Sequence, residues 1–403
     1  MHSLNFRRLQ LDKQIKFRYH PLFFFNFEEI SVRPSLLGTA FTSLKMLLKT
    51  KLCCIAALFN LCIASVHAEE VYSADTFAIG TLINGQFKTA DKEKAEACYA
   101  ILNDETRRLE YILSAYDADS DVTKLNKHAG EWVEIHPETY ELLNGSKTIA
   151  ALTHGAFDPT VGGIVKLWSI DQPTHRVPSE VEIQKVLPYV DYNAIDTKKE
   201  NGKLLGRIGK GQNVSFGAIG KGFIADKVIE KLKKGGCTDS LVSLGGNVIG
   251  NGTNASNKPW AIGLQRPDKK RGEFFAVVPL SNTSVVTSGD YEKFFVKDGV
   301  KYHHILDPRS GKPVPATLSS VTIIDENSAK ADALCTALFV MGWSGAIEYL
   351  ERHPDLKAVL LSENLKHIAM TESAEKLVQL VDKSMSVDII PPKGRVSFSK
   401  SKK

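Results

Sequence analysis

Two histidines, an aspartate and a threonine that can take part in chemistry lie within residues 287–342. His303 and His304 stand in the run YHHILDP, and Asp332 and Thr336 stand in ADALCTALF. Because Asp332 and Thr336 are four residues apart, their side chains would share one face of a helix. A carboxylate and a hydroxyl are hard oxygen donors of the kind that hold Mg²⁺ together with phosphate and water. An ordinary helix with a carboxylate in its first turn would carry the same pair.

The adjacent histidines cannot both serve the same site. Neighbouring residues on a strand point to opposite faces, so at most one of His303 and His304 faces a given ligand. That histidine could act as a base that takes a proton from a hydroxyl. The alternative is a histidine that is hydrogen-bonded within the fold and has no chemical role.

Lys221 lies in a glycine-rich turn, SFGAIGKGFIAD, that leads into a predicted helix. Backbone N–H groups at the start of a helix favour anions, and a lysine adds a positive charge there. The GxxxxGK[ST] pattern of a P-loop is absent, so a plain connection between a strand and a helix is the alternative.

Three further turns could approach a ligand. Residues 155–163 read GAFDPTVGG and residues 244–247 read LGGN, and both could also be plain turns. Residues 114–121, SAYDADSD, offer Tyr116 as an aromatic partner for a flat ring, although an acidic helix cap would look the same. This acidic run lacks the spacing of an EF-hand calcium loop.

The surrounding sequence alternates between helical and strand patterns without regular βαβ repetition, which favours an α+β fold. Apolar spacing and end signals predict helices at 91–114, 137–153, 178–187, 219–234, 328–341, 344–352 and near 373–381. Strands are predicted as a pair within 72–88, repeatedly between 240 and 324, and at 356–361 and 366–370. No internal repeat is found.

Charge is concentrated at the N-terminus of this 403-residue chain. Residues 1–68 hold 9 of the 51 basic and 3 of the 46 acidic residues, which leaves 42 and 43 for residues 69–403. The near-neutral body gives no electrostatic case for nucleic-acid binding.

Residues 46–68 have the pattern of a signal peptide. Lys49 and Lys51 precede an apolar run, and VHA at 66–68 resembles a cleavage site. An uncleaved anchor is the alternative, and the sequence before Cys62 does not fit a lipoprotein anchor. Met46 is a candidate start, with 1–45 as a misassigned extension. The globule is then expected at 69–385, followed by a basic disordered tail at 386–403.

Three of the six cysteines lie in the leader, and Cys98, Cys237 and Cys335 lie in the body. This spacing is neither a zinc pattern nor a disulfide framework. At most one bridge could form, and three buried thiols are the simpler expectation.

The motifs together resemble one family, the FAD:protein FMN transferases known as ApbE flavin transferases. The resemblance covers about residues 76–381. It rests on IGT (79–81), LSAYDADSDVTKLN (113–126), GAFDPTVGGIVKLW (155–168), FGAIGKGFIAD (216–226), SLGGN (243–247), WAIGLQRP, TSGDYEKFF, YHHILDPRSGKP and ADALCTALFVMG.

The resemblance implies one α+β domain that binds FAD in a cleft and is a transferase of phosphorus-containing groups. The implied reaction is Mg²⁺-dependent transfer of FMN from FAD to a Thr or Ser hydroxyl of an acceptor protein, with release of AMP. The implied acceptors are subunits of membrane redox complexes or other exported flavoproteins. With the leader, this predicts a periplasmic protein, with the inner membrane as a candidate place of association.

The resemblance also implies roles for individual residues. Mg²⁺ would be bound by the main-chain oxygen of Ala218 and the side chains of Asp332 and Thr336, and His304 would be the base. The implied FAD contacts are Ile79, Tyr116, Ala156, Phe157, Asp158, Ser215, Lys221, Ile305 and Cys335. The family usually has Met where Ile79 stands and Asp where Ser215 stands, so an apolar contact is kept and a carboxylate is lost.

Two other functions remain open at this point. A flavin-binding protein without transfer activity, or one that only hydrolyses FAD, would share the binding residues. A periplasmic solute-binding protein would need two similar lobes, and the sequence shows no duplicated pattern.

Overall fold

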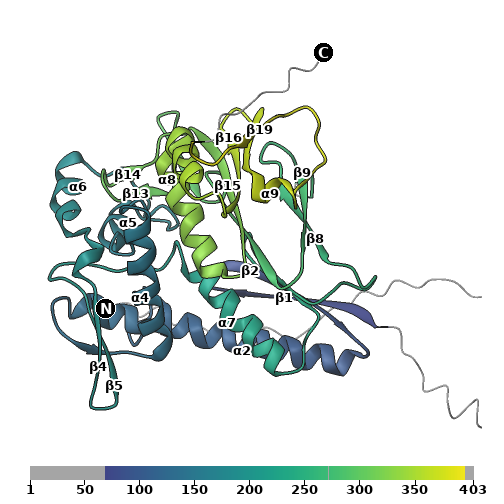
Figure 1. Cartoon of the computed structure of the whole chain (residues 1–403). Coiled ribbons are helices and arrows are strands. Elements are labelled where there is room, and N and C mark those ends of the chain that lie inside the picture. The colour runs from purple at the N-terminus through teal and green to yellow at the C-terminus, as the bar shows by residue number, and fades with distance from the viewer. Residues whose placement is uncertain (1–68, 271, 395–403) are drawn as a thin grey trace, which may run out of the picture. The chain divides into compact units, whose positions relative to one another are not determined.

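The structure is a computed structural model that describes residues 69–270 and 272–394 of the chain (Figure 1). The signal peptide expected at 46–68, the extension expected at 1–45 and residues 395–403 of the expected tail lie outside the described residues. Residues from Val71 onward belong to one compact unit.

A nine-stranded sheet runs through this unit in the order β1-β2-β6-β7-β10-β15-β16-β17-β19. The pairs from β2 to β17 are antiparallel, and β19 runs parallel to β17. Its strands are β1 (Glu70–Ala78), β2 (Thr81–Thr89), β6 (Ser240–Leu244), β7 (Asn247–Asn251), β10 (Thr283–Gly289), β15 (Leu318–Asp325), β16 (Lys357–Ser362), β17 (His367–Thr371) and β19 (Ser386–Ile390).

Helices pack on one face of this sheet and a small sheet packs on the other (Figure 1). The helices on the sheet are α2 (Lys92–Leu113), α7 (Gly220–Lys234) and α8 (Ser328–Arg352), and α4 (Pro137–Leu152) packs against α8 and α2. The small sheet is β8 (Trp260–Gln265), β9 (Phe274–Leu280) and β18 (Gln379–Leu380). Strand β10 shows the alternation that separates the two cores, since Val286 packs with the helices and Val285 with the small sheet.

Shorter elements complete the fold. The helices are α3 (Asp121–Lys127), α5 (Gly162–Trp168), α6 (Glu180–Val186), α9 (Glu372–Glu375) and the 3₁₀ turns Leu187–Tyr189 and Tyr192–Ala194. The strands are β3 (Val133–Glu134), β4 (Asp196–Glu200), β5 (Lys203–Arg207), β11 (Phe294–Lys297), β12 (Val300–His303), β13 (Leu306–Asp307) and β14 (Lys312–Pro313).

Helix α8 is the central helix of the core. Gly342 interrupts it with φ 71° and ψ −179°, a conformation that glycine adopts without strain, so the predicted break between residues 341 and 344 is correct. The helix is long and apolar enough to cross a membrane, but 56% of its most apolar window is buried inside the protein. Its composition is therefore explained by core packing.

The α+β prediction is confirmed, and two local predictions are wrong. The helix expected near 373–381 shrinks to the four residues of α9, because the following residues leave the helix and pair as β18 with β9. The tail does not begin at 386, because Ser386–Ile390 pairs with β17 and closes the edge of the large sheet.

The expectation of three buried thiols is also wrong. Cys98 of α2 and Cys237, just after α7, form a disulfide, and Cys335 is a buried free thiol. The packing of α2 against α7 brings the two Cα atoms to 6.0 Å across 139 residues of sequence, a proximity that the spacing alone could not show.

Loss of this bridge should lower the free energy of unfolding by about 2–5 kcal/mol, because the disulfide closes a long loop in the unfolded chain. Urea unfolding of residues 69–403 with and without reductant measures this. A Cys98→Ala/Cys237→Ala variant should unfold at the same urea midpoint as the reduced protein, and reductant should not change its midpoint. Equal midpoints for the oxidised and reduced proteins would contradict the expectation.

Candidate active site

The first turns of α7 and α8 meet at a contact that leaves no room for a side chain. A Cβ placed on Gly222 would lie 2.1 Å from the carbonyl oxygen of Ser328 and 2.8 Å from the Cα of Ala329. Both atoms belong to the backbone and cannot rotate away. Only glycine at position 222 lets the two helices approach this closely.

Each helix supplies a carboxylate to the first turn of the other. The N–H of Gly222 donates to Oδ2 of Asp332 at 3.0 Å, while the N–H groups of Ser328 and Ala329 donate to Asp226 at 2.9 Å each. Helix α7 has no side-chain cap from its own N-cap residue, so Asp332 provides it from α8. The reciprocal bonds fix Asp332 relative to the start of α7.

Asp226 is a residue that the motif analysis did not single out. Burial raises its pKa to about 6, although the two N–H bonds from α8 act in the opposite direction. Its position four residues after Gly222 in GKGFIAD was the available signal, because that spacing returns it to the same face of α7.

The predicted metal and phosphate residues lie around this contact. Asp332 is 2% exposed, and Nζ of Lys221 lies 3.5 Å from its Oδ1. Thr336 follows one helical turn later and is half-buried, as is Ala218 just before α7. Within the described residues, no group of three or more His, Cys, Asp and Glu side chains is placed to hold a metal. The metal site with one carboxylate therefore stays a prediction.

The two histidines point in different directions, as the strand pattern predicted. His303 is 3% exposed, its Nε2 lies 2.9 Å from the carbonyl of Val314, and its Nδ1 accepts from the N–H of Ile305. His304 is exposed, and its Nδ1 lies 3.1 Å from the carbonyl oxygen of Lys293. Both ring nitrogens of His303 are thus hydrogen-bonded within the fold, whereas His304 faces outward.

The pKa of His304 falls to about 4. The protein that surrounds the ring disfavours its charged form, even though solvent reaches the side chain, and the positive charge of Lys221 adds to the effect.

Tyr116 contacts the residues that follow α5. Its hydroxyl accepts from Nε2 of Gln172 at 3.4 Å, and the neighbouring Asp171 lies 3.8 Å from Nζ of Lys293. Since the carbonyl of Lys293 contacts His304, a series of contacts connects Tyr116 with His304. The Tyr116 side chain is 73% exposed and free to meet a planar ring.

Ile79 occupies a strained turn between β1 and β2. Its φ of 48° is unusual for a β-branched residue, and Gly80 follows with φ 70°, so both residues have the positive φ of a type I′ hairpin. The N–H of Ile79 donates to Glu110 of α2 at 2.6 Å, which helps to hold the turn. Strain of this kind is common at functional sites.

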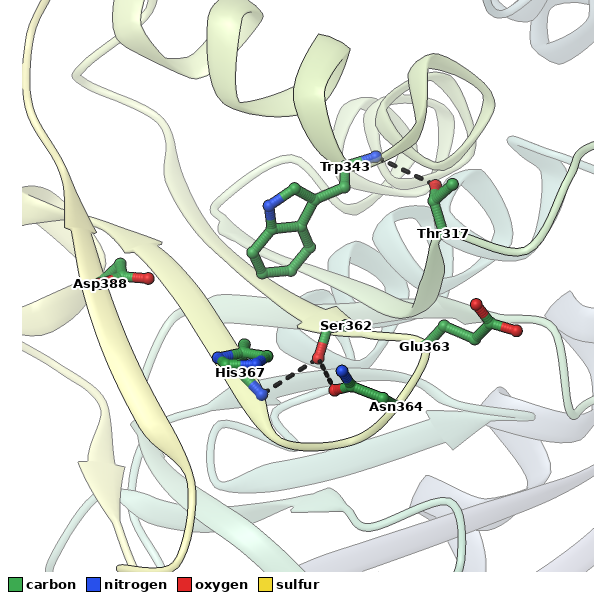
Figure 2. Close-up of a pocket in the computed structure, with 7 residues that line it drawn as sticks. All are labelled: Thr317, Trp343, Ser362, Glu363, Asn364, His367 and Asp388. Carbon is green, nitrogen blue, oxygen red and sulfur yellow. Dashed lines mark hydrogen bonds between the residues drawn. The ribbon is translucent and has the colours of Figure 1, made fainter.

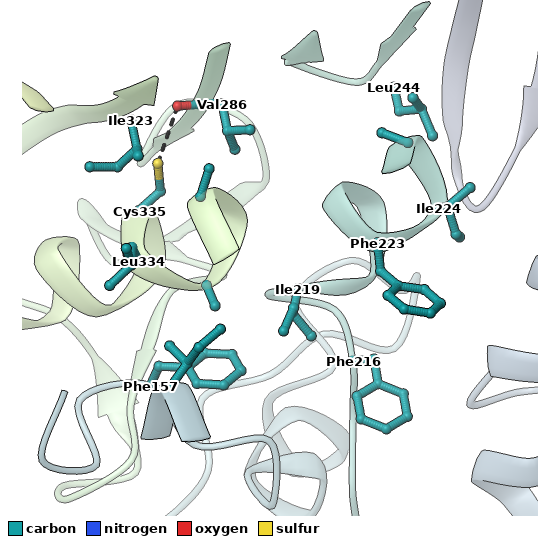
Figure 3. Packing of buried hydrophobic residues seen from close by; sticks show 14 of the residues in the cluster. Phe157, Phe216, Ile219, Phe223, Ile224, Leu244, Val286, Ile323, Leu334 and Cys335 are labelled. Atoms are coloured by element: carbon teal, nitrogen blue, oxygen red, sulfur yellow. Dashed lines mark hydrogen bonds between the residues drawn. The ribbon is translucent and has the colours of Figure 1, made fainter. Parts of the chain in front are cut away.

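Other residues assigned to FAD are largely buried. Ala156, Phe157, Asp158, Ile305 and Cys335 are at most 5% exposed, and Figure 3 shows Phe157 and Cys335 within the core cluster. Both carboxylate oxygens of Asp158 accept hydrogen bonds inside the protein.

Ser215 is half-buried, and its N–H donates to the carbonyl of Pro159 at 2.8 Å. These six residues are therefore buried or half-buried, whereas Tyr116, Lys221 and His304 present reachable side chains.

Two cavities were found near α8. One of about 530 Å³ opens between α4, α7 and α8, with Phe223, Leu334 and Tyr349 in its lining. The other, of about 360 Å³, lies beside the break at Gly342 and includes Trp343, His367 and Asp388 (Figure 2). Neither is lined by a residue predicted to bind FAD or metal.

Comparison with known proteins agrees with the fold. The model of the ApbE family matches residues 79–360, which is more than half of the chain. The chain belongs to the ApbE family. The resemblance noted from the motifs is thereby confirmed.

Curated relatives carry one name. The FAD:protein FMN transferase of Treponema pallidum is 33% identical over 328 residues, covering 77% of this chain and 89% of that protein. A second protein of that name, from Klebsiella pneumoniae, is 31% identical over 296 residues, covering 73% and 90%.

Solved structures of the ApbE family share the architecture. The ApbE protein of Thermotoga maritima aligns with TM-score 0.70 and 32% identity, covering 76% of this chain and 99% of that chain. The apo form of the flavinyl transferase ApbE of Pseudomonas stutzeri aligns with TM-score 0.68 and 26% identity, covering 78% and 98%.

The contact between α7 and α8 can be tested with two glycines of the same helical turn. Gly222→Ala should destabilise the protein by about 1–3 kcal/mol or more, because its Cβ would meet backbone atoms. Gly220→Ala is the matched control, since its Cβ would lie 3.6 Å from the nearest atom, at ordinary contact distance. Thermal unfolding measures both variants, and equal melting temperatures would contradict the packing described.

Proposed function

We propose that this ApbE-family protein transfers FMN from FAD to a Thr or Ser hydroxyl of an acceptor protein, forming a phosphoester and releasing AMP. The observation that carries the proposal is the pairing of Lys221 with Asp332 at the first turns of α7 and α8, together with the effect of the Lys221 charge on the pKa of His304. The names of the curated relatives support the same reaction.

The first turn of α7 suits the two phosphates of FAD. The positive end of the α7 dipole attracts anions, although the N–H of Gly222 already donates to Asp332 and the N–H of Gly220 to the carbonyl of Phe216. Lys221 adds a positive charge on the same turn. These groups would hold the diphosphate and orient the phosphorus on its flavin side.

The oxygen donors fit a magnesium ion. Asp332 is a buried carboxylate that already has the ammonium of Lys221 beside Oδ1, so the position favours a cation. Asp332, Thr336 and the carbonyl of Ala218 are hard oxygen donors, and Mg²⁺ is commonly held by few protein ligands together with phosphate. When bound, the ion would neutralise charge on the diphosphate.

His304 is suited to accept a proton from the acceptor hydroxyl. The carbonyl of Lys293 can only accept a hydrogen bond, so Nδ1 of His304 carries the ring proton and Nε2 keeps a lone pair. The lowered pKa leaves the ring neutral at physiological pH. Because His304 is exposed, a protein side chain can reach it.

The reaction balances with these residues. The hydroxyl oxygen forms a bond to the flavin-side phosphorus while the bond from that phosphorus to the AMP oxygen breaks. The hydroxyl proton passes to Nε2 of His304 and then to solvent, and AMP leaves as an anion. Most of the rate enhancement would come from positioning and charge neutralisation, and the base would add about 10²–10⁴-fold.

The setting of the reaction is part of the proposal. A leader at 46–68 would export the chain to the periplasm, where subunits of membrane redox complexes are suitable acceptors, with association at the inner membrane.

An acceptor assay distinguishes transfer from hydrolysis and from simple binding. Residues 69–403, FAD and Mg²⁺ are incubated with an apo flavoprotein domain that is known to carry FMN on threonine, and intact mass is measured. Transfer adds one FMN to the acceptor. Release of free FMN and AMP without that addition would indicate a hydrolase, and intact FAD that stays bound would indicate a binding protein.

Asp332→Asn should abolish transfer more fully than FAD binding, because it removes the charge but keeps an oxygen for the N–H of Gly222. Excess EDTA should stop the wild-type enzyme, and added Mg²⁺ should restore it. Transfer rates and FAD affinity are compared for both proteins. Full activity in EDTA would refute the metal site.

His304→Ala should reduce the transfer rate by about 10²–10⁴-fold while FAD remains bound.

In the wild-type protein the His304 ring should stay neutral as pH falls below 6.5 and gain its proton only near pH 4, because the folded protein lowers its pKa. NMR titration of the labelled imidazole measures this value. Since the unfolded chain protonates first, this residue should reduce stability as pH falls from 6.5 to 4.

A Lys221→Met variant is the matched test of the electrostatic cause. Loss of the positive charge should raise the pKa of His304, because Lys221 disfavours the charged imidazole. An unchanged titration in this variant would show that Lys221 does not lower the pKa of His304.

A further inference from the structure

Asn247 is a buried amide without a protein partner. Asn247 is 1% exposed, and neither the oxygen nor the nitrogen of its side chain has a hydrogen-bond partner among the residues that the structure describes. Leaving a buried amide unbonded costs free energy, so such groups are rare in folded proteins and call for an explanation. A ligand that bonds the amide would provide one.

The register of the sheet shows which face Asn247 occupies. Asn247 lies directly opposite Leu244 on β6 and opposite Val286 on β10. Directly opposite residues share a face, and both neighbours belong to the core beneath the helices. The amide therefore lies on the helix-covered face between two apolar side chains that cannot bond it.

This position adjoins the candidate active site. The carbonyl of Val286 accepts a hydrogen bond from Sγ of Cys335 at 3.1 Å (Figure 3), and Cys335 is three residues after Asp332 on α8. On the other side, Gly245 approaches β2 so closely that a Cβ would lie 2.3 Å from the hydroxyl of Thr81. Asn247 is thus bracketed by α8 and by the strained turn that contains Ile79.

We infer that Asn247 binds the hydrogen-bonding edge of the flavin ring, an inference that rests on the proposed function. The pyrimidine edge of a flavin presents a carbonyl, an N–H and a second carbonyl in a row. The amide oxygen of Asn247 accepts from the flavin N3–H, and its NH₂ group donates to an adjacent carbonyl, so both unpartnered atoms are used. The apolar neighbours Leu244 and Val286 suit the larger and more apolar of the two ring systems in FAD.

This pairing gives Asn247 a role in specificity. A site whose buried polar groups match a ligand rejects analogues that leave those groups unbonded. The diphosphate held at α7 and the ring edge held at Asn247 would fix the flavin at two separate points. The flavin-side phosphorus would then be positioned before an acceptor arrives.

The first test compares FAD with N3-methyl-FAD, which lacks the N3–H donor, by fluorescence titration. The wild-type protein should bind N3-methyl-FAD roughly tenfold or more weakly, because one bond is lost and the methyl group meets the amide. Asn247→Leu should bind FAD with a similar loss and should not distinguish the two flavins. Equal binding of both flavins by the wild-type protein would overturn the inference.

Protein stability gives an independent readout. Asn247→Leu should leave the ligand-free melting temperature unchanged or raise it, because a buried unbonded amide is replaced by an apolar group of similar size. A lower melting temperature with unchanged FAD affinity would show that the amide is structural, for example bonded to a buried water. A third comparison uses FAD modified at the adenine N6. The ratio of the wild-type affinity to the Asn247→Leu affinity should be the same for this analogue as for FAD. A different ratio would assign Asn247 to the adenine ring and overturn the inference.

The two proposals can fail separately. Wild-type protein that binds FAD but flavinylates no acceptor would refute the transferase while the flavin titrations still decide the role of Asn247. Wild-type protein that transfers FMN while Asn247→Leu keeps full affinity for FAD would refute the Asn247 assignment alone.

Discussion

The structure of the site depends on the contact between the first turns of α7 and α8. At most helix starts the free N–H groups are bonded by a residue just before the helix, but here a carboxylate of each helix bonds the N–H groups of the other. The arrangement requires Gly222, because any larger residue would hold the helices apart. Asp332 consequently takes its position from the approach of two helices that belong to different parts of the sequence.

This contact also determines the charges of the site. Two positive helix ends meet two carboxylates, and Lys221 lies beside the buried oxygen of Asp332. The carboxylate attracts a cation, while the positive helix end and the lysine attract an anion. A diphosphate with a divalent ion carries both kinds of charge and would be complementary to this surface. Burial lowers the pKa of His304 and the same lysine adds to this effect, so the charge proposed to bind phosphate also helps to keep the proposed base neutral.

Much of the fold could be predicted from local patterns, because the helices α2, α4, α7 and α8 follow apolar spacing and clear end signals. The reachable site residues Tyr116, Lys221 and His304 could be found from motifs. Contacts between distant segments could not: the disulfide of Cys98 with Cys237 needs the packing of α2 on α7, and Asp226 acquires its role only when α8 lies beside it. Strand β19 was missed because its pairing with β17, and not its composition, orders it.

The distribution of exposure within the site fits a reaction between a small molecule and a protein. Residues such as Phe157, Ile305 and Cys335, to which FAD contacts were assigned, are buried and shielded from water. Tyr116 and His304 face outward, so the reacting hydroxyl can be brought in on another protein. An enzyme that acted on FAD alone would gain from enclosing both sides, because open access to water favours hydrolysis. An open side suits an acceptor that is too large to be enclosed, and His304, the proposed base, is exposed to solvent.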